Sequence, residues 1–304
     1  MKVGIIGFGS MGRNHARVIQ RMRDCEIVGF YDPGFVSGED YIELQKNSLN
    51  ELLSFSPHYL VVASPTPSHF EILTQLLHTK IPLLVEKPIC GKSVESKELS
   101  RMLPEIDFPV GVGHVERFNP AVASSREIIK SGLIGEIISV DTLRKGPNPN
   151  RYLGVGVMLD LMSHDIDTTM WLTGQKYSEK SAMVFQLENS HFEDFAHFQG
   201  KTEGGTLIRH QVDWISPIKI RQSRILGSKG MMTIDTISNS LQIALQSKVG
   251  PKIEVIDPSP SSVEPLEMEH LHFQQMISGV RSNVATIHEG LSVVDVILSL
   301  IENR

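Results

Sequence analysis

A glycine-rich turn directly after an apolar strand is the feature that most constrains how this chain can fold. Residues 3–12 read VGIIGFGSMG, so that Gly7, Gly9 and Gly12 stand in a GxGxxG spacing. In this pattern the first glycine permits a tight turn, the second lets the backbone approach a pyrophosphate, and the third allows a helix to pack closely on the strand. The turn therefore predicts a dinucleotide-binding Rossmann unit, with the diphosphate on the N-terminus of the following helix.

The residues around the turn support this prediction and indicate which dinucleotide binds. An apolar, β-branched run covers 2–6, and apolar side chains recur at helical spacing over 11–23. A second strand over 27–31 leads to Asp32, where a carboxylate can accept hydrogen bonds from both ribose hydroxyls. Because a carboxylate repels a 2′-phosphate and no arginine immediately follows it, NAD is favoured over NADP. The expected cofactor contacts from this region are Gly7, Phe8, Gly9, Ser10, Met11, Gly12 and Asp32.

Strands and helices alternate through the first part of the chain, which predicts a parallel, doubly wound sheet. The expected further strands are 59–63, 81–85 and 109–112, and the expected helices are 48–55, 67–78 and 93–103. Ligands bind at the carboxyl ends of such strands. Polar motifs follow three of them, at Ser64–Thr66, Glu86–Pro88 and His114–Asn119.

Beyond residue 119 the pattern changes. Several strand-like stretches separated by turns fill 180–256, which predicts an antiparallel sheet. The other expected elements are helices at 122–131, 157–172, 266–278 and 289–301 and a strand at 137–143, with Gly174 as a helix C-cap. The expected fold class is α/β, with a Rossmann domain over 1–119 and an α+β domain with a largely antiparallel open sheet over 120–304.

The composition excludes several classes of partner. A net charge of -6 and a pI near 6.1 provide no basic field for nucleic acid. The longest apolar runs are strand-sized, shorter than a membrane span, and the first strand begins without a signal peptide. Cys25 and Cys90 are the two cysteines, which fits a reducing compartment. We therefore expect a cytoplasmic protein without nucleic-acid or membrane partners.

Lys87 is the first candidate for chemistry, because it follows an expected central strand at the mouth of the cofactor crevice. Pro88 disfavours a helical conformation for the residue before it and leaves a cis peptide accessible, so Lys87 can be aimed toward the crevice. The alternative is an ordinary exposed surface lysine.

Asp160, His164 and Asp167 form the second candidate group, on an otherwise apolar helix. Positions i, i+4 and i+7 share one helix face, so this polar stripe either faces water or lines a pocket. Histidine is a suitable proton acceptor at neutral pH, and a neighbouring carboxylate can orient it. Asp160 and His164 also have a spacing found among metal ligands, but no third ligand is evident and no metal is expected. Asp165 has no explanation at this level.

Together these motifs resemble the Gfo/Idh/MocA oxidoreductases, and they occur in the family's order along nearly the whole chain. The segments that carry the resemblance are the glycine turn, ASPTPSH at 63–69, EKP at 86–88, RFNP at 117–120, DxxxHDID at 160–167 and GSKG at 227–230. The resemblance implies a Rossmann domain paired with an α/β domain whose open sheet makes a homodimer or homotetramer, and an NAD(P)-dependent reaction at a sugar hydroxyl.

The resemblance also implies roles for individual residues. Lys87 corresponds to the lysine at the reacting hydroxyl and the nicotinamide ribose, set in place by Glu86 and Pro88. Asp160 and His164 correspond to a substrate-binding and catalytic pair, and whether Lys87 or His164 is the base is left open. Ser64, Pro65, Thr66 and His69 correspond to a segment that lines the ribose and nicotinamide.

Residues 112–121, VGHVERFNPA, most resemble members that oxidise the 3-hydroxyl of UDP-N-acetylglucosamine or its uronic acid. A diphosphate needs donors, and Arg117, Arg144, Lys145 and Arg151 could supply them. The expected substrate contacts are Lys87, His114, Arg117, Asn119, Arg151, Asp160 and His164. The alternatives are a same-family dehydrogenase of a free sugar, inositol or sugar acid, a reductase working in the opposite direction, and a non-catalytic NAD-sensing regulator.

Overall fold

The computed structural model describes residues 1–34, 41–148, 154–247, 250–256 and 263–302. Contacts divide the chain into two compact units, Met1–His114 with Leu266–Val294, and Val115–Pro265 with Asp295–Arg304. The first crossing between the units lies near the boundary expected at residue 119, but the contribution of 266–294 to the first unit was not anticipated.

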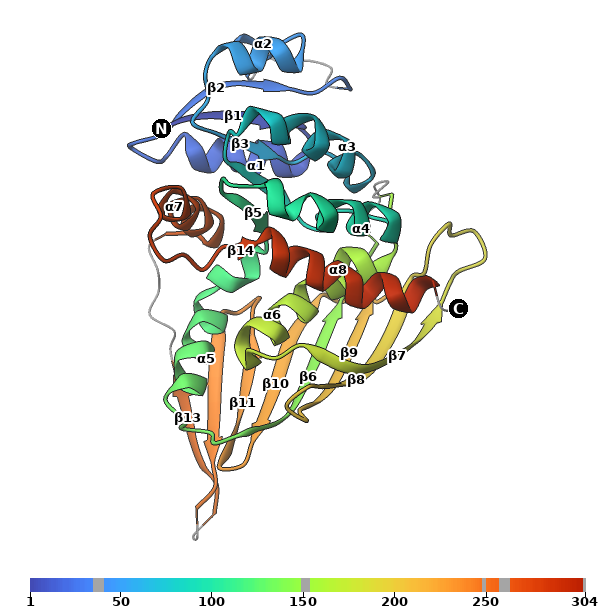
Figure 1. Cartoon of the computed structure of the whole chain (residues 1–304). Helices are drawn as coiled ribbons and strands as arrows, with labels where there is room; N and C mark the ends of the chain where they lie inside the picture. The colour runs from blue at the N-terminus through green and yellow to red at the C-terminus, as the bar shows by residue number, and fades with distance from the viewer. Residues whose placement is uncertain (35–40, 149–153, 248–249, 257–262, 303–304) are drawn as a thin grey trace. The chain divides into compact units, whose positions relative to one another are not determined.

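The first unit is built on a six-stranded sheet with the order β14-β5-β4-β3-β1-β2 (Figure 1). Its parallel strands are β1 (Lys2–Ile6), β2 (Glu26–Tyr31), β3 (Tyr59–Val62), β4 (Leu83–Glu86) and β5 (Val110–Gly113), and β14 (Ala285–Thr286) runs antiparallel to β5. Strands β3, β4 and β5 are buried along their whole length, as expected for apolar strands covered on both faces.

Helices connect these strands as the alternating pattern predicts. The helices with residues in this unit are α1 (Ser10–Ile19), α2 (Leu49–Ser54), α3 (Thr66–Leu76), α4 (Ser93–Met102), α7 (Pro265–Ile277) and α8 (Ile287–Glu302). Short 3-10 turns occupy Ile42–Leu44, Leu77–Thr79 and Leu103–Glu105. Ser48 caps α2 by accepting a hydrogen bond from the Glu51 N–H, so the helix begins where the sequence indicates.

The second unit contains an eight-stranded sheet with the order β13-β12-β11-β10-β6-β9-β8-β7. The strands are β6 (Ile137–Lys145), β7 (Tyr177–Phe185), β8 (Phe195–Thr202), β9 (Leu207–Asp213), β10 (Ile220–Gly227), β11 (Gly230–Asp235), β12 (Ser240–Leu245) and β13 (Lys252–Ile256). Every neighbouring pair is antiparallel except β6 and β9. Helices α5 (Pro120–Lys130) and α6 (Ser163–Thr173) cover one face of this sheet (Figure 1).

The predicted fold class is confirmed, with two local differences. The helix expected over 157–172 begins as a π-helical segment, Met158–Met162, and continues as α6 to its left-handed C-cap at Gly174. Strand β14 has only two residues, too few to produce an alternation pattern that a sequence could reveal. Among the described residues, no helix has the length and apolar character that a membrane crossing requires.

Candidate functional site

The glycine turn has the geometry of a dinucleotide cradle. Gly7 has a φ of 86°, and a Cβ at this position would overlap the Ser64 backbone nitrogen. A Cβ on Gly12 would overlap the Gly7 carbonyl oxygen, whereas a Cβ on Gly9 meets no described atom within 4 Å. Gly7 and Gly12 are therefore required by the turn and by helix packing, and Gly9 leaves open space at the N-terminus of α1.

The N-terminus of α1 is suited to a negative ligand. Gly9 is its N-cap and has no side chain to satisfy the free N–H groups, and the first turn contains no acidic residue. These N–H groups and the helix dipole favour an anion. The residues present thus fit the pyrophosphate of NAD, with Phe8, Ser10 and Met11 supplying the surrounding backbone.

Asp32 lies beside the glycine turn. Its Oδ2 accepts a hydrogen bond from the Phe8 N–H at 2.6 Å, and its Oδ1 accepts one from the Gly34 N–H at 2.8 Å. The Phe8 ring stacks on Phe30 with 3.7 Å between centroids, which anchors this part of the turn to β2. Because a carboxylate has about four lone-pair directions, Asp32 retains acceptor capacity for ribose hydroxyls.

His69 connects the segments that follow β3 and β4. Its Nε2 lies 2.8 Å from the Ser64 carbonyl oxygen, and its Nδ1 lies 2.8 Å from the Pro88 carbonyl oxygen. The ring is buried, and burial lowers its pKa. Since both ring nitrogens lie against backbone carbonyl oxygens, His69 connects these two segments.

Lys87 and its neighbours stand at the carboxyl end of β4. The Lys87–Pro88 peptide is cis, and Lys87 is half-buried rather than a fully exposed surface lysine. Glu86 is buried, and its Oε1 lies 2.9 Å from His15 Nε2. Burial opposes the charge of Glu86, but the hydrogen bond from His15 and the charge of Lys87 hold the pKa of Glu86 below its usual range. His15 was not identified from the sequence, because nothing in the spacing of α1 connects it with residue 86.

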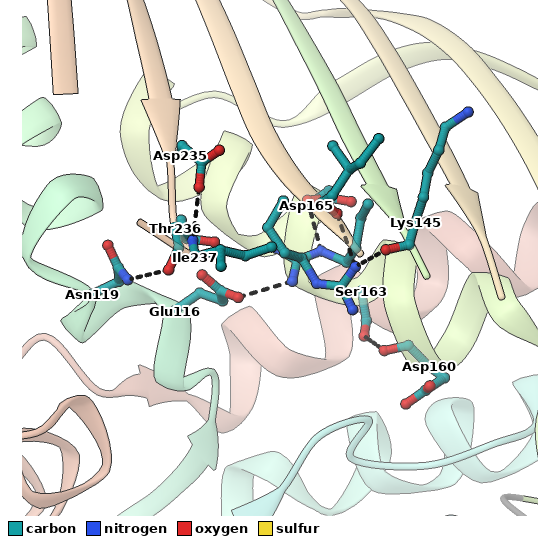
Figure 2. A network of polar contacts seen from close by, with 12 residues as sticks. Glu116, Asn119, Lys145, Asp160, Ser163, Asp165, Asp235, Thr236 and Ile237 are labelled. Carbon is teal, nitrogen blue, oxygen red and sulfur yellow. Dashed lines mark hydrogen bonds and ion pairs between the residues drawn. The ribbon is translucent and has the colours of Figure 1, made fainter. Parts of the chain in front are cut away.

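In the second unit the expected polar stripe separates into two environments. Asp160, in the π-helical segment, and His164, in α6, are half-buried, whereas Asp167 is buried and 1% exposed. The Ser163 hydroxyl donates a hydrogen bond to the Asp160 carbonyl at 3.3 Å (Figure 2). π-Helical turns often occur at functional sites. Asp160 and His164 therefore stay the predicted substrate-binding and catalytic pair, and Asp167 has another role.

Asp167 holds Arg117. The Arg117 Nε lies 2.9 Å from Oδ2 and its Nη2 lies 2.6 Å from Oδ1, with both side chains almost fully buried. The guanidinium also lies 5.8 Å from the Trp171 ring. A buried arginine that already neutralises a carboxylate is a poor donor for a diphosphate. In the structure Arg117 connects the segment after β5 to α6, and its contact with the substrate stays a prediction.

Arg144 has a similar role, and it explains Asp165. The Arg144 Nη1 donates to Glu116 Oε1 at 2.8 Å, and its Nε donates to Asp165 Oδ1 at 3.1 Å (Figure 2). Burial opposes the charge of Arg144, but the two carboxylates raise its pKa. Burial raises the pKa of Asp165 despite the neighbouring arginine. Arg144 is therefore also committed to internal partners.

The remaining expected substrate contacts are distributed unevenly. Asn119 caps α5, because its Oδ1 accepts hydrogen bonds from the Ala121 and Val122 N–H groups, and its Nδ2 reaches the Thr236 carbonyl at 3.4 Å (Figure 2). His114 is buried. Arg151 lies outside the described residues.

Arg221 is a cation that sequence reasoning missed. It lies half-buried on β10, where its Nη1 donates to the Lys145 carbonyl at 2.6 Å. Burial and the charge of Arg144 lower its pKa, whereas Asp165, Glu116 and Asp160 act in the opposite direction. No sequence motif includes Arg221, because it comes near Asp165, Glu116 and Asp160 only when β10 pairs with β6. Within the described ranges, no group of three or more His, Cys, Asp and Glu side chains could hold a metal ion.

Two family models match the chain. A model described as an oxidoreductase family with an NAD-binding Rossmann fold matches residues 1–114, and a model described as the GFO/IDH/MocA C-terminal domain matches residues 122–233. Among curated proteins, UDP-N-acetylglucosamine 3-dehydrogenase of Acidithiobacillus ferrooxidans is 25% identical over 247 residues, which is 80% of this chain and 76% of that protein. An inositol 2-dehydrogenase of Corynebacterium glutamicum is 26% identical over 185 residues, 58% of this chain and 55% of that protein.

Solved structures share the fold over almost the full length. The Acidithiobacillus ferrooxidans enzyme superposes with a TM-score of 0.85 at 23% identity, covering 99% of this chain and 97% of that chain. An oxidoreductase from Agrobacterium radiobacter, solved with NAD+, L-tartaric acid and magnesium, has a TM-score of 0.87 at 17% identity and covers 99% of this chain and 95% of that chain. At these identities the likeness concerns the fold.

Proposed function

Because the chain belongs to the Gfo/Idh/MocA family of NAD-binding oxidoreductases, we propose that it oxidises a ring hydroxyl of a sugar to a ketone with NAD. The observation that carries the proposal is the combination at the glycine turn: open space at Gly9, a helix N-terminus without an acidic first turn, and the Asp32 carboxylate beside Phe8. A carboxylate at this position favours a free 2′-hydroxyl, and therefore NAD over NADP.

In the proposed reaction, each candidate residue has a defined role. When bound, NAD supplies a hydride acceptor for the carbon that bears the hydroxyl. His164 accepts the hydroxyl proton, with Asp160 binding the substrate beside it, and Lys87 hydrogen-bonds the oxygen as charge develops there. Glu86 and Pro88 position Lys87, while Ser64, Pro65, Thr66 and His69 shape the cofactor side of the site.

We propose a UDP-N-acetyl-hexosamine as the substrate, oxidised at its 3-hydroxyl. The name of the 25% identical relative supports this choice, whereas the inositol 2-dehydrogenases support a free polyol as the second candidate. With Arg117 and Arg144 committed to buried carboxylates, Arg221 is the described arginine best suited to meet an acidic group of the substrate. Its guanidinium is half-buried and has the Asp160 carboxylate among its electrostatic neighbours.

We also propose that the protein forms a homodimer or homotetramer through the sheet of the second unit. One face of this sheet is covered by α5 and α6, and the alternation along its strands leaves apolar side chains exposed on the other face. Large exposed apolar patches are typical of interaction surfaces. These side chains are Leu143, Met183, Phe185, Leu207, Leu226 and Met231.

The substrate assignment is tested by following NADH formation at 340 nm with NAD or NADP and a panel of UDP-sugars, free sugars, inositols and sugar acids. We expect turnover of a UDP-N-acetyl-hexosamine with NAD. Turnover of a free polyol alone would replace the nucleotide-sugar assignment, and reduction of the keto compounds alone would reverse the direction. NAD binding without turnover of any compound would indicate a sensor instead of an enzyme.

Single substitutions test the proposed roles. Lys87→Ala and His164→Ala should each lower kcat by about 100-fold or more, because each removes a group that acts on the reacting hydroxyl. Asp32→Ala should narrow the preference for NAD over NADP, measured as the ratio of the two kcat/KM values. Near wild-type turnover in both of the first two variants would exclude this mechanism.

A further inference from the structure

Four buried side chains of the first unit form a continuous polar chain that ends at Glu86. Glu86 Oε1 lies 2.9 Å from His15 Nε2, His15 Nδ1 lies 2.9 Å from His270 Nε2, and His270 Nδ1 lies 3.0 Å from the Tyr59 hydroxyl. Both histidines and Tyr59 are 0% exposed, and Glu86 is 7% exposed. This polar chain joins β4, α1, α7 and β3. It forms only because α7, which follows the second unit in the sequence, packs in the first unit.

The chemistry of the four groups gives the chain one direction. An ionised Glu86 can only accept, so His15 must carry its proton on Nε2. When His15 Nδ1 is the acceptor, His270 donates from Nε2 and accepts at Nδ1 from the Tyr59 hydroxyl. Each donor in the sequence Tyr59, His270, His15 therefore points toward Glu86.

We propose that Tyr59, His270 and His15 are positioning residues that fix Glu86 as an anion beside Lys87. This inference deepens the proposed dehydrogenase function and rests on it for the role of Lys87. In this arrangement Lys87 is the hydrogen-bond donor to the reacting oxygen, and His164 is the proton acceptor.

The directions in which burial and partners move the four groups agree with this arrangement. Burial lowers the pKa of His270 well below its ordinary value, which keeps the His270 ring neutral. Burial raises the pKa of Tyr59 well above its ordinary value, which keeps its hydroxyl proton available to donate. The other charges that act on Glu86 are those of Lys87, its chain neighbour, and His69 on α3.

The tautomers provide a test that needs no substrate. Selective 15N labelling of histidine and long-range 15N–1H correlation spectra of the full-length protein at pH 7 distinguish Nε2–H from Nδ1–H rings. We expect His15 to carry a proton on Nε2 and His270 to be a neutral ring protonated on Nε2, with their signals assigned from His270→Gln and Tyr59→Phe. A His15 ring without a proton on Nε2, or a His270 ring protonated on Nδ1, would overturn the inference, whatever the enzyme's substrate.

Activity profiles test the consequence for Lys87. His270→Leu removes the donor to His15 and the acceptor for Tyr59, so the ionisation of Glu86 should enter the acid limb of the kcat/KM profile beside that of His164 and make this limb steeper. His270→Gln keeps an N–H and a carbonyl in the same two directions and should restore most of the wild-type profile. Phe273→Leu is the matched control, because Phe273 lies on the same helix and packs against Tyr59 at 5.4 Å without a polar atom.

The possible outcomes separate this inference from the proposed function. Equal acid limbs in His270→Leu and Phe273→Leu would mean that the chain has only a structural role, even if a sugar substrate is confirmed. Failure of every sugar substrate would remove the dehydrogenase assignment but leave the tautomer measurement decisive for the chain. The full inference would be supported by Nε2–H at both histidines, together with a change in the acid limb of His270→Leu that His270→Gln reverses.

Discussion

At the scale of single residues, the three glycines of the turn have different reasons to be glycine. Gly7 and Gly12 have no room for a Cβ because neighbouring backbone atoms occupy the space, and Gly7 also has a positive φ. Gly9 has a negative φ of −71° and no described atom within 4 Å of its Cβ position. The absence of a side chain at Gly9 therefore serves a ligand and not the fold.

This difference can be measured with two alanine variants. Gly9→Ala should leave the free energy of unfolding within about 0.5 kcal/mol of wild type but weaken NADH binding about tenfold, because its Cβ enters the space of the pyrophosphate. Gly12→Ala should weaken NADH binding and also lower the free energy of unfolding by about 2 kcal/mol, because α1 must move away from Gly7. Urea unfolding and NADH titration distinguish the two effects. Unchanged NADH affinity in Gly9→Ala would contradict the cradle geometry.

At the scale of elements, one buried histidine connects three strands of the second unit. His210 on β9 lies 2.7 Å from the Thr142 hydroxyl on β6 through Nδ1 and 2.7 Å from the Tyr177 hydroxyl on β7 through Nε2. It also stacks on Phe198 of the intervening β8, with 5.2 Å between centroids. Burial, with a smaller contribution from the charge of Arg144, lowers the pKa of His210 to about 3. The neutral ring is therefore part of the sheet core.

The stability of the sheet should depend on this titration. Histidine in an unfolded chain has a pKa of about 6.5, whereas the pKa of folded His210 is about 3. Between these two pH values only the unfolded state gains a proton. The free energy of unfolding should thus fall by up to about 1.4 kcal/mol per pH unit as pH decreases through this window. Urea unfolding at pH 6.5, 5.5 and 4.5 gives the free energy of unfolding at each pH. In His210→Gln, the change of this free energy per pH unit should be smaller than in wild type by about that amount. Parallel curves for the two proteins would exclude this contribution.

At the scale of the whole molecule, the exposed face of the eight-stranded sheet determines the expected assembly. Leu226 and Met231 lie opposite each other on β10 and β11, and Leu143 lies on the neighbouring β6. Their exposed fractions of 39%, 37% and 37% are high for large apolar side chains within strands. A second copy of the chain that covers this face would remove the apolar surface from water.

Charges on this face should therefore dissociate the oligomer. We expect the double variant Leu226→Asp/Met231→Asp to sediment as a monomer at concentrations where the wild type forms a dimer or tetramer, because burying the new carboxylates is costly. Ile218→Asp is the control, since Ile218 is 70% exposed in the loop between β9 and β10 and not in a strand. A monomeric wild-type protein at micromolar concentration would refute the proposed interface.

The sequence by itself determined the features whose physical cause is local. The glycine spacing, the strand before it and Asp32 defined the dinucleotide-binding unit, because each acts within one βαβ segment. Alternation of apolar residues and turns likewise predicted the parallel and antiparallel sheets, and the motifs at 86–88 and 160–167 indicated the candidate groups. Gly174 as a helix C-cap was recognisable for the same reason.

Only the tertiary structure decided which charges are internal and which buried groups are connected. Arg117 and Arg144 appear in the sequence as cations before Asp160, but Asp167, Asp165 and Glu116 neutralise them once the strands and α6 pack. His15 and His270 are 255 residues apart and meet because α7 returns to the first unit. Such contacts follow from non-local packing, in which a buried charge or ring must find a partner, and no sequence period records where that partner lies.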